Sequence, residues 1–441
     1  YPMTRKLLAL AALALMASSA ADWKAGVSKI LITPRSPVWM AGYAARTKPS
    51  EGTLQDLYVK ALALEDRTGR RVVLVSSDLL GFPAAVADNI AARVEKQHRL
   101  GREALLLNSS HTHGGPVVGV TLRVAYRGAA DYWPAIEVYT RELEDKVVEA
   151  VGAALTNLEP AQLSFGRSQV LFAGNRRLKL NPKGPVDHDV PVLRVQTKLL
   201  RAVVFGYACH NTTVGADMYQ FHGDYAGFAQ EMLEQVNPAA TVFFLTGCGA
   251  DANPNPRGTV DLARKHGETL AEAVEAAFRR PMRAIRGPLT AVFDRVPVAF
   301  APPPDRAEWQ KRLADPNAFV QAHARLMLET LDRDGRLQTE YPYPVQVWQF
   351  GRDLTLVALA GEVVVDYALR LKRELGPDKL WVAGYSNDVF AYIPSRRVLE
   401  EGGYEGEGAM LYYGQPGKFA PAVEETIIGK VHELVKKAAR R

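Results

Sequence analysis

The stretch ALLLNSSHTHGGP, Ala104–Pro116, turns from an apolar run into two histidines followed by two glycines and a proline. Residues 104–107 have the length and the lack of polar alternation of a strand covered on both faces. Beyond them, on an extended backbone, His111 and His113 would point to the same side. Neutral imidazole is a common zinc ligand, so the pair predicts a metal site. Hydrogen-bonded core histidines are the alternative interpretation.

Apolar runs of strand length recur along the whole chain and alternate with helical patterns. Strands are predicted at residues 72–75, 104–107, 191–195, 202–207, 242–245 and 354–360. Helices are predicted at residues 84–98, 136–158, 225–236, 260–279, 316–332, 363–375 and 420–440. This alternation predicts an α/β fold with mixed, largely buried β-sheets flanked by helices.

Three further stretches place polar side chains just after apolar runs. His210 follows residues 203–209, at a strand end where α/β folds place their sites. Glu362 follows another such run and is expected to open a helix, whose dipole alone would explain a carboxylate there. Residues 244–256 run from a strand into a polar loop, in which Asp251 is either a turn residue or a functional one. A cation held by such side chains leaves room for an activated water, which favours a hydrolase over a binding module.

The two ends of the chain bear on location and partners. Arg5 and Lys6 precede an apolar run, residues 7–17, and small residues follow it. This pattern predicts a signal peptide over residues 1–20 and a secreted or periplasmic protein, with a retained anchor as the alternative. No later stretch is apolar enough to cross a bilayer. The net charge is +6, but the basic residues are spread out, which argues against nucleic-acid binding and leaves peripheral membrane contact and oligomeric state open.

Domain organisation and the two cysteines complete the outline. Residues 279–305 are rich in proline and glycine, but the candidate site draws on both sides of them. Residues 21–441 are therefore expected to form a single domain. Cys209 and Cys248 could form one disulfide in an exported protein or remain buried thiols.

Taken together, these stretches resemble the neutral ceramidase family, whose members are zinc amidases that cleave the N-acyl bond of sphingolipids. The similar segments occur in the family's order over nearly the whole chain. They are residues 40–44, 110–113, 174–176, 210–213, 360–362, 386–392 and 404–406.

The resemblance implies a role for each matching residue. The zinc ligands would be His111, His210, Glu362 and Tyr392. Near them, His113 would lie beside the metal-bound water or the leaving group, and Tyr404 and Arg176 would line the pocket and could stabilise an oxyanion. Gly42, in a matching segment, would bind substrate. Beyond the resemblance, the ordinary pKa of histidine makes His113 the candidate general acid, Asp251 could orient an imidazole or hold a loop, and Asn253 could help the oxyanion.

Two departures from the family pattern matter. The family has a catalytic serine where this chain has Asn253, and an amide cannot serve as a nucleophile. Zinc lowers the pKa of a bound water to about 7, so water would attack the carbonyl directly. The family also carries a C-terminal β-sandwich domain, which is not expected within this sequence.

The resulting hypothesis is an exported zinc-dependent hydrolase, a ceramidase-like amidase that acts on linear amides. Its substrate would be an N-acyl (sphingo)lipid or a smaller N-acyl compound, which points to lipid metabolism. A carbohydrate-active metalloenzyme of the same fold, either a glycosidase or a lyase, is the alternative. A non-catalytic binding protein is a further one.

Overall fold

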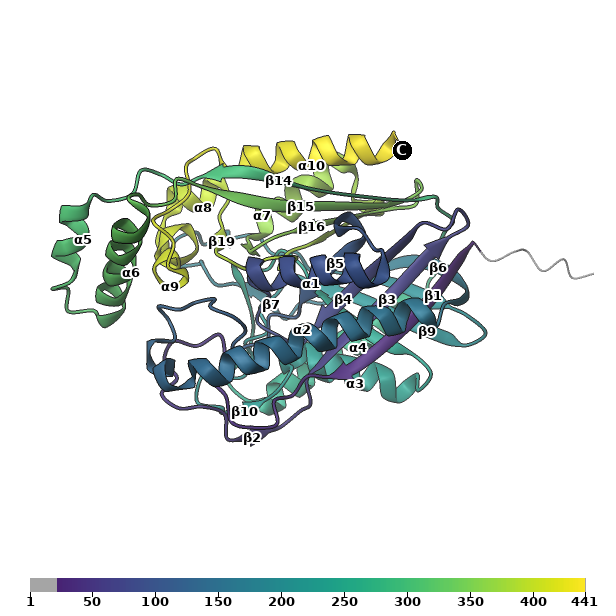
Figure 1. The fold of residues 1–441 in the computed structure, drawn as a ribbon. Coiled ribbons are helices and arrows are strands. Elements are labelled where there is room, and N and C mark those ends of the chain that lie inside the picture. Colours follow the sequence, from purple (N-terminus) through teal and green to yellow (C-terminus); the bar gives the residue numbers. More distant parts are fainter. Residues whose placement is uncertain (1–21, 441) are drawn as a thin grey trace, which may run out of the picture.

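Two large β-sheets with helices packed against them form the fold in the computed structural model, which describes residues 22–440 (Figure 1). The predicted α/β class, with mixed and largely buried sheets, is confirmed. The predicted signal peptide, residues 1–20, lies outside the described residues. Among residues 22–440, no helix combines the length and hydropathy that a membrane span requires.

The larger sheet has nine strands and mixes parallel with antiparallel pairs. In spatial order its strands are β11 (Thr241–Thr246), β9 (Leu200–Tyr207), β8 (Asp189–Gln196), β6 (Glu159–Gln169), β1 (Trp23–Leu31), β3 (Tyr58–Asp66), β4 (Arg71–Ser77) and β5 (Leu105–Ser109), and β13 (Arg283–Ile285) pairs with β6. Only the outer pairs, β11 with β9 and β4 with β5, are parallel.

The second sheet packs on the first, because one buried cluster contains residues of both. Its strands are β14 (Leu289–Ala299), β15 (Glu340–Phe350), β16 (Leu354–Leu359) and β18 (Leu380–Ala383). Three short pairs complete the strands: β2 (Gly52–Thr53) with β10 (Gln220–Phe221), β7 (Ala173–Asn175) with β12 (Ala252–Pro254), and β17 (Glu362–Val363) with β19 (Tyr392–Ile393).

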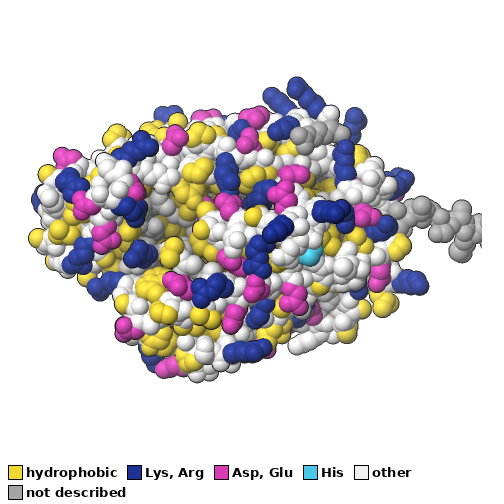
Figure 2. All heavy atoms as spheres, viewed as in Figure 1, with side chains coloured by type: hydrophobic (Ala, Val, Ile, Leu, Met, Phe, Trp, Pro, Cys, Tyr) yellow, Lys and Arg dark blue, Asp and Glu magenta, His cyan; other side chains and the backbone are white. Residues whose placement is uncertain are grey.

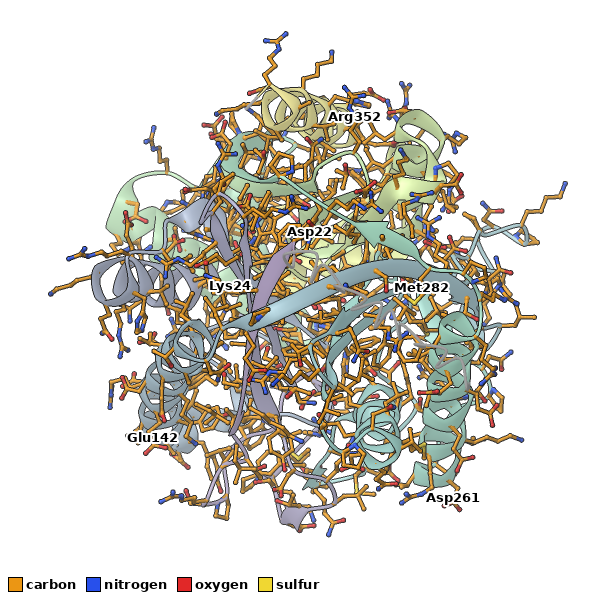
Figure 3. All side chains as sticks on the ribbon, turned by 90° about the vertical axis from the view of Figure 1, so that its right-hand side faces the viewer. Asp22, Lys24, Glu142, Asp261, Met282 and Arg352 are labelled. Atoms are coloured by element: carbon orange, nitrogen blue, oxygen red, sulfur yellow. The ribbon has the colours of Figure 1, made fainter. Side chains whose placement is uncertain are left out.

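Helices cover both faces of the larger sheet. On β1, the Ser28 hydroxyl donates to a carbonyl of α2, whereas the neighbouring Lys29 pairs with Glu234 of α3, so these two helices lie on opposite faces. In Figure 3, Glu142 marks α2 and Asp261 marks α4 on the two flanks. The helices are α1 (Ala84–His98), α2 (Trp133–Thr156), α3 (Asp224–Val236), α4 (Val260–Phe278), α5 (Arg306–Arg312), α6 (Ala318–Asp334), α7 (Val365–Leu375), α8 (Arg396–Glu401), α9 (Met410–Tyr413) and α10 (Val423–Ala439).

Residues 279–305 contain more structure than the sequence predicts. They include β14, which pairs with β15 along its whole length, so that Pro297 faces Pro342. Proline removes a backbone donor, and β14 tolerates it because it is the edge of its sheet. Cys209 and Cys248 are both free and buried, which corresponds to the second of the two expected arrangements.

Candidate metal centre

The segments at the ends of β5, β9, β11, β16 and β18 meet at one place. Isolated bridges join Asn108 to Ser386, Thr112 to Asn211, and Gly247 to Ala383. The buried Asn108 amide connects three of these segments, since its Oδ1 accepts from the Thr246 N–H (3.1 Å) and its Nδ2 donates to the Gly384 carbonyl (2.8 Å). Strand ends that are far apart in the sequence therefore form one floor.

Five nitrogen and oxygen atoms that could coordinate a metal ion converge above these strand ends. The Nε2 atoms of His111 and His210 lie 3.2 and 3.0 Å from Oε2 of Glu362. The Tyr392 hydroxyl is 3.2 Å from the His210 Nε2, and the His113 Nε2 is 3.4 Å from the His111 Nε2. These are the four ligands and the neighbouring histidine that the sequence predicts, and the structure brings all of them together.

The hydrogen bonds of the two imidazoles show that this cluster fits a cation. The Nδ1 of His111 faces the Leu80 carbonyl at 2.7 Å, and the Nδ1 of His210 faces the Gly249 carbonyl at 3.0 Å. A carbonyl can only accept, so each Nδ1 carries a hydrogen, and in the neutral form of each ring the lone pair of Nε2 points inward. Those lone pairs meet an ionised carboxylate, an arrangement that a bound cation stabilises.

Burial sets the charge of these groups. Burial, together with the Arg176 charge, lowers the pKa of His210 to about 4, and burial also holds the pKa of His113 well below its usual value. Burial alone would raise the pKa of Glu362, but the adjacent His111 and His210 keep it well below its ordinary value. A neutral His210 and an ionised Glu362 are the protonation states that metal ligands need.

The backbone at His111 differs from the predicted strand. The strand β5 ends at Ser109, and His111 has a φ of +59°, in the left-handed region. The prediction that an extended backbone points both histidines to the same side is therefore wrong. Their rings come together because the chain turns at His111. The Leu80 carbonyl accepts from the His111 ring, and the Tyr385 ring packs against it with the two ring centroids 4.4 Å apart.

Glu362 does not open a helix as predicted. It begins β17, directly opposite Tyr392 in β19, and α7 starts at Val365. The second carboxylate oxygen of Glu362 accepts a hydrogen bond from the Tyr413 hydroxyl. Burial, followed by the Glu362 charge, holds the pKa of Tyr413 well above its usual value, so this hydroxyl keeps its proton and donates.

Arg176 and Tyr404 stand beside the cluster. The Arg176 guanidinium donates to the Tyr392 hydroxyl (Nη2, 3.0 Å) and to Glu405 (Nε, 2.6 Å). The Tyr404 ring lies 5.2 Å from that of Tyr392 and is 44% exposed, at the mouth of a small cavity above the cluster. Gly42 also lines this cavity, against the ring of His113.

Asp251 and Asn253 lie apart from that cavity. The fully buried Asp251 carboxylate accepts from the Val365 N–H (2.9 Å) and from Asn175 (3.1 Å), so it ties α7 to β7. Burial raises the pKa of Asp251 to about 6. Asn253 pairs with Gly174 between β12 and β7, and its Oδ1 accepts from the Thr212 hydroxyl at 3.4 Å. Neither side chain is among those that line the cavity.

Sequence reasoning missed three residues that shape the centre. Asn108 lies within residues 104–116 but carried no predicted role, Tyr385 directly precedes the stretch 386–392, and Tyr413 has no local signal at all. Buried amides and hydroxyls act through their tertiary partners, which spacing along the chain does not reveal. Only the adjacency of Asn108 to a buried strand end could have pointed to it.

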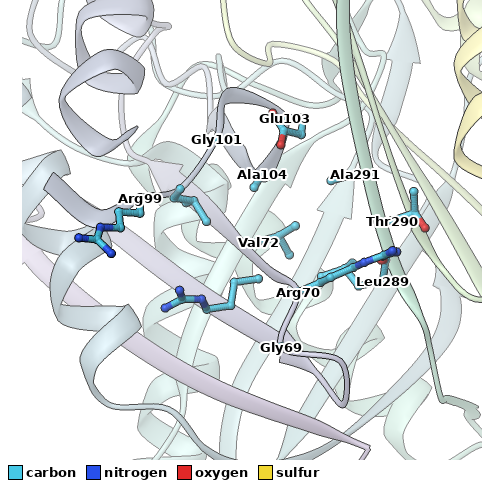
Figure 4. Close-up of a pocket in the computed structure, with 12 residues that line it drawn as sticks. Gly69, Arg70, Val72, Arg99, Gly101, Glu103, Ala104, Leu289, Thr290 and Ala291 are labelled. Atoms are coloured by element: carbon cyan, nitrogen blue, oxygen red, sulfur yellow. The ribbon is translucent and has the colours of Figure 1, made fainter. Parts of the chain in front are cut away.

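Other parts of the surface are polar and lie away from the centre. A cavity of about 390 Å³, lined by Arg70, Arg99 and Glu103, opens at the ends of β4 and β5 that are remote from the histidines (Figure 4). On the face shown in Figure 2, basic and acidic side chains are interspersed, without a continuous basic band among the described residues.

Comparison with known proteins identifies the family. The model of the family described as neutral/alkaline non-lysosomal ceramidase, N-terminal, matches residues 23–260, more than half of the chain. The chain belongs to this family. The matched part contains His111 and His210, whereas Glu362 and Tyr392 lie beyond it. No curated protein matches this chain.

Solved ceramidase structures share the fold. The neutral ceramidase from Pseudomonas aeruginosa superposes with a TM-score of 0.75 at 19% identity, covering 95% of this chain and 74% of the other. A ceramidase complexed with C2 gives a TM-score of 0.73 at 19% identity and covers 94% and 76%. Membership of the ceramidase family makes this chain a ceramidase-like hydrolase from a metal-dependent family. Ring nitrogens of His111, His113 and His210 lie within 4.8 Å of one another, close enough to hold a metal ion.

Proposed function

We propose that this protein is a zinc-dependent amidase that hydrolyses the N-acyl bond of a linear amide with water as the nucleophile. The convergence of two inward-facing imidazole nitrogens on the ionised Glu362 carries the proposal, because three buried acceptors meet there. Family membership supplies the reaction class. The Asn253 side chain supports water as the nucleophile, since an amide cannot attack a carbonyl.

The proposed ligands are His111, His210, Glu362 and Tyr392. Zinc bound there would polarise the substrate carbonyl and lower the pKa of water. Burial holds the pKa of Tyr392 well above its usual value, and the Arg176 guanidinium, 3.0 Å from the hydroxyl, opposes that shift; a bound zinc ion would have to complete the deprotonation for Tyr392 to act as a ligand. Tyr413 orients the Glu362 carboxylate through its hydrogen bond.

His113 is the proposed proton carrier. Its ring is neutral because burial holds its pKa low, so it can accept a proton from the attacking water and pass it to the leaving nitrogen. Its Nδ1 is buried and has no hydrogen-bond partner among the described residues, which leaves the ring free of a competing contact. This role refines the general acid that the sequence predicts, because the neutral ring must first gain a proton.

Tyr404 and Arg176 are proposed to stabilise the developing oxyanion. Burial, together with the Glu362 charge, keeps the pKa of Tyr404 above its usual value, so its hydroxyl remains a donor. Arg176 does not line the cavity, and its positive charge, held in place by Glu405, would act through the Tyr392 hydroxyl to which it donates. An anionic carbohydrate substrate is not favoured, because no Lys or Arg side chain is among the residues that line the cavity.

Metal analysis tests the proposal. The purified protein is expected to carry about one zinc ion per chain. His111→Ala should remove most of it and abolish amide hydrolysis, whereas His432→Ala, which alters an exposed histidine of α10 paired with Glu374, should change neither. Full zinc occupancy in His111→Ala, or amidase activity in a metal-free protein, would contradict the proposal.

Export is part of the proposal and has its own test. The basic start and apolar run before residue 21 support a secreted or periplasmic location. N-terminal sequencing of the protein recovered outside the cytoplasm should begin near Ala21. Recovery of the intact N-terminus from the cytoplasmic fraction would contradict export.

A further inference from the structure

The cavity above the metal centre has a polar floor and apolar walls. It has a volume of about 70 Å³. The polar side of the cavity is formed by His111, His113, Glu362 and Tyr392. One apolar side is formed by Leu80, Leu122 and Ala125. Tyr412 and Tyr413 of α9 also line the cavity and pack against the same cluster, and the 44% exposed Tyr404 lies at the mouth.

The inner wall is closed by a packed cluster and cannot easily retreat. Leu80, Leu122 and Ala125 belong to a buried group that also contains Val117 and Tyr126. The Tyr126 hydroxyl accepts from the Gly42 N–H at 2.7 Å, which fixes the backbone on the near side. Packed cores resist insertion of extra methylene groups, so the depth of the cavity is set by these side chains.

The volume limits the ligand. Clefts that enclose drug-sized or lipid ligands usually have about 300–1,000 Å³. A volume of 70 Å³ accommodates roughly five water-sized groups. We propose that the cavity receives the acyl group of the substrate and is specific for short acyl chains, of about two to four carbons, because the proposed zinc ion and its water take part of the same space. This inference rests on the proposed amidase function and names its substrate class.

The acyl side fits the cavity better than the amine side. The apolar sides of the cavity present aliphatic side chains and aromatic rings, and the charged side chain among the lining residues is Glu362, at the metal centre. A hydrocarbon chain needs no hydrogen-bond partner there, whereas an amine with polar substituents would lose its hydration without replacement. The leaving amine therefore lies towards the mouth, near the half-exposed Tyr404.

A series of N-acyl 4-nitroanilides, from acetyl to dodecanoyl, tests the inference. The kcat/KM should rise about fourfold per added methylene up to propanoyl or butanoyl and then fall at least about tenfold by dodecanoyl. Leu122→Ala should move the maximum to chains longer by one or two carbons. Since Leu122 has a φ of +51°, an alanine keeps the same backbone cost.

Two variants complete the series. Ala125→Leu fills the cavity and should move the maximum towards acetyl, which keeps the inference testable if Leu122→Ala fails to fold. Leu199→Ala, at an exposed turn before β9, should leave the profile unchanged. A maximum at eight or more carbons, or a profile that neither cavity variant moves, would overturn the inference. Tolerance of long acyl groups combined with rejection of large amines would overturn the assignment of the acyl side.

Binding of linear carboxylates separates this inference from the proposed function. The zinc-loaded protein is titrated with acetate, butanoate, octanoate and dodecanoate by calorimetry. Tightest binding of butanoate supports the cavity even if no amide is hydrolysed, in which case only the proposed function fails. Affinity that increases steadily up to dodecanoate overturns the short-chain preference, whatever the activity.

Discussion

Glu362 and Tyr392 lie directly opposite each other as the first residues of two short parallel strands, β17 and β19. The pairing sets the carboxylate and the phenol 3.0 and 3.2 Å from the same nitrogen, Nε2 of His210. Backbone register, rather than side-chain packing alone, therefore determines the spacing of half of the proposed ligands. A one-residue slip of either strand would turn its ligand side chain away from the imidazoles.

Loss of the Tyr413 hydroxyl should weaken metal binding. Tyr413→Phe keeps the ring but removes the donor to Glu362, so the carboxylate is less firmly oriented. The Kd for zinc, measured by competition with a chelator, should rise by about 10–100-fold. Tyr412→Phe is the matched control, and an equal Kd in both variants would show that the hydroxyl has no such role.

Gly42 should be irreplaceable because of the His113 ring. A Cβ at Gly42 would lie 2.4 Å from Cγ of His113, so Gly42→Ala must displace the imidazole. Amide hydrolysis should fall by about 100-fold. Gly69→Ala provides the control, since Gly69 also has positive φ but no atom lies within 4 Å of its added Cβ. Comparable losses in both variants would attribute the effect to backbone strain.

Removal of the Asn108 amide should destabilise the joined strand ends beneath the metal centre. Asn108→Ala leaves the Thr246 N–H and the Gly384 carbonyl without their partner. The free energy of unfolding should fall by about 2–3 kcal/mol, and zinc affinity should fall with it. Asn181→Ala, which breaks a partly buried hydrogen bond to Glu401, should cost less in urea denaturation and leave zinc binding unchanged.

Asp388 should make stability depend on pH. Burial raises the pKa of its carboxyl to about 7 from an ordinary 3.8, so between these values the folded protein keeps a proton that the unfolded chain releases. Stability therefore falls as the pH rises from about 4 to about 7. Asp388→Asn retains an acceptor for the Tyr341 hydroxyl and should raise the Tm at pH 8 far more than at pH 4.

The exposed Asp261 gives the matched control for this pH effect. Asp261→Asn should shift the Tm equally at both pH values. A shift in Asp388→Asn that is also independent of pH would show that the Asp388 carboxyl titrates near its ordinary pKa.

Local patterns predict much of this fold. The helix predicted at residues 84–98 coincides with α1, and the apolar runs 202–207 and 242–245 correspond to β9 and β11. Each has a clear period or an uninterrupted apolar stretch. The edge strand β14 was missed because the prolines in and around it suggest a connection, and its pairing with β15 depends on residues far along the chain.

The candidate centre was predictable only as a set of side chains. His111, His210, Glu362 and Tyr392 stand in recognisable stretches, but the left-handed turn at His111 and the register of β17 with β19 do not follow from local sequence. Asp251 stands in a recognisable polar loop, but its side chain accepts from the Val365 N–H and is not among the residues that line the cavity.

The proposed ligands come from both halves of the chain, between His111 and Tyr392. Tight metal capture must therefore await the docking of the second sheet onto the first. Zinc uptake would then report the last long-range step of folding, and a truncated translation product lacking Glu362 would be distinguishable from the finished protein by its weak hold on the ion.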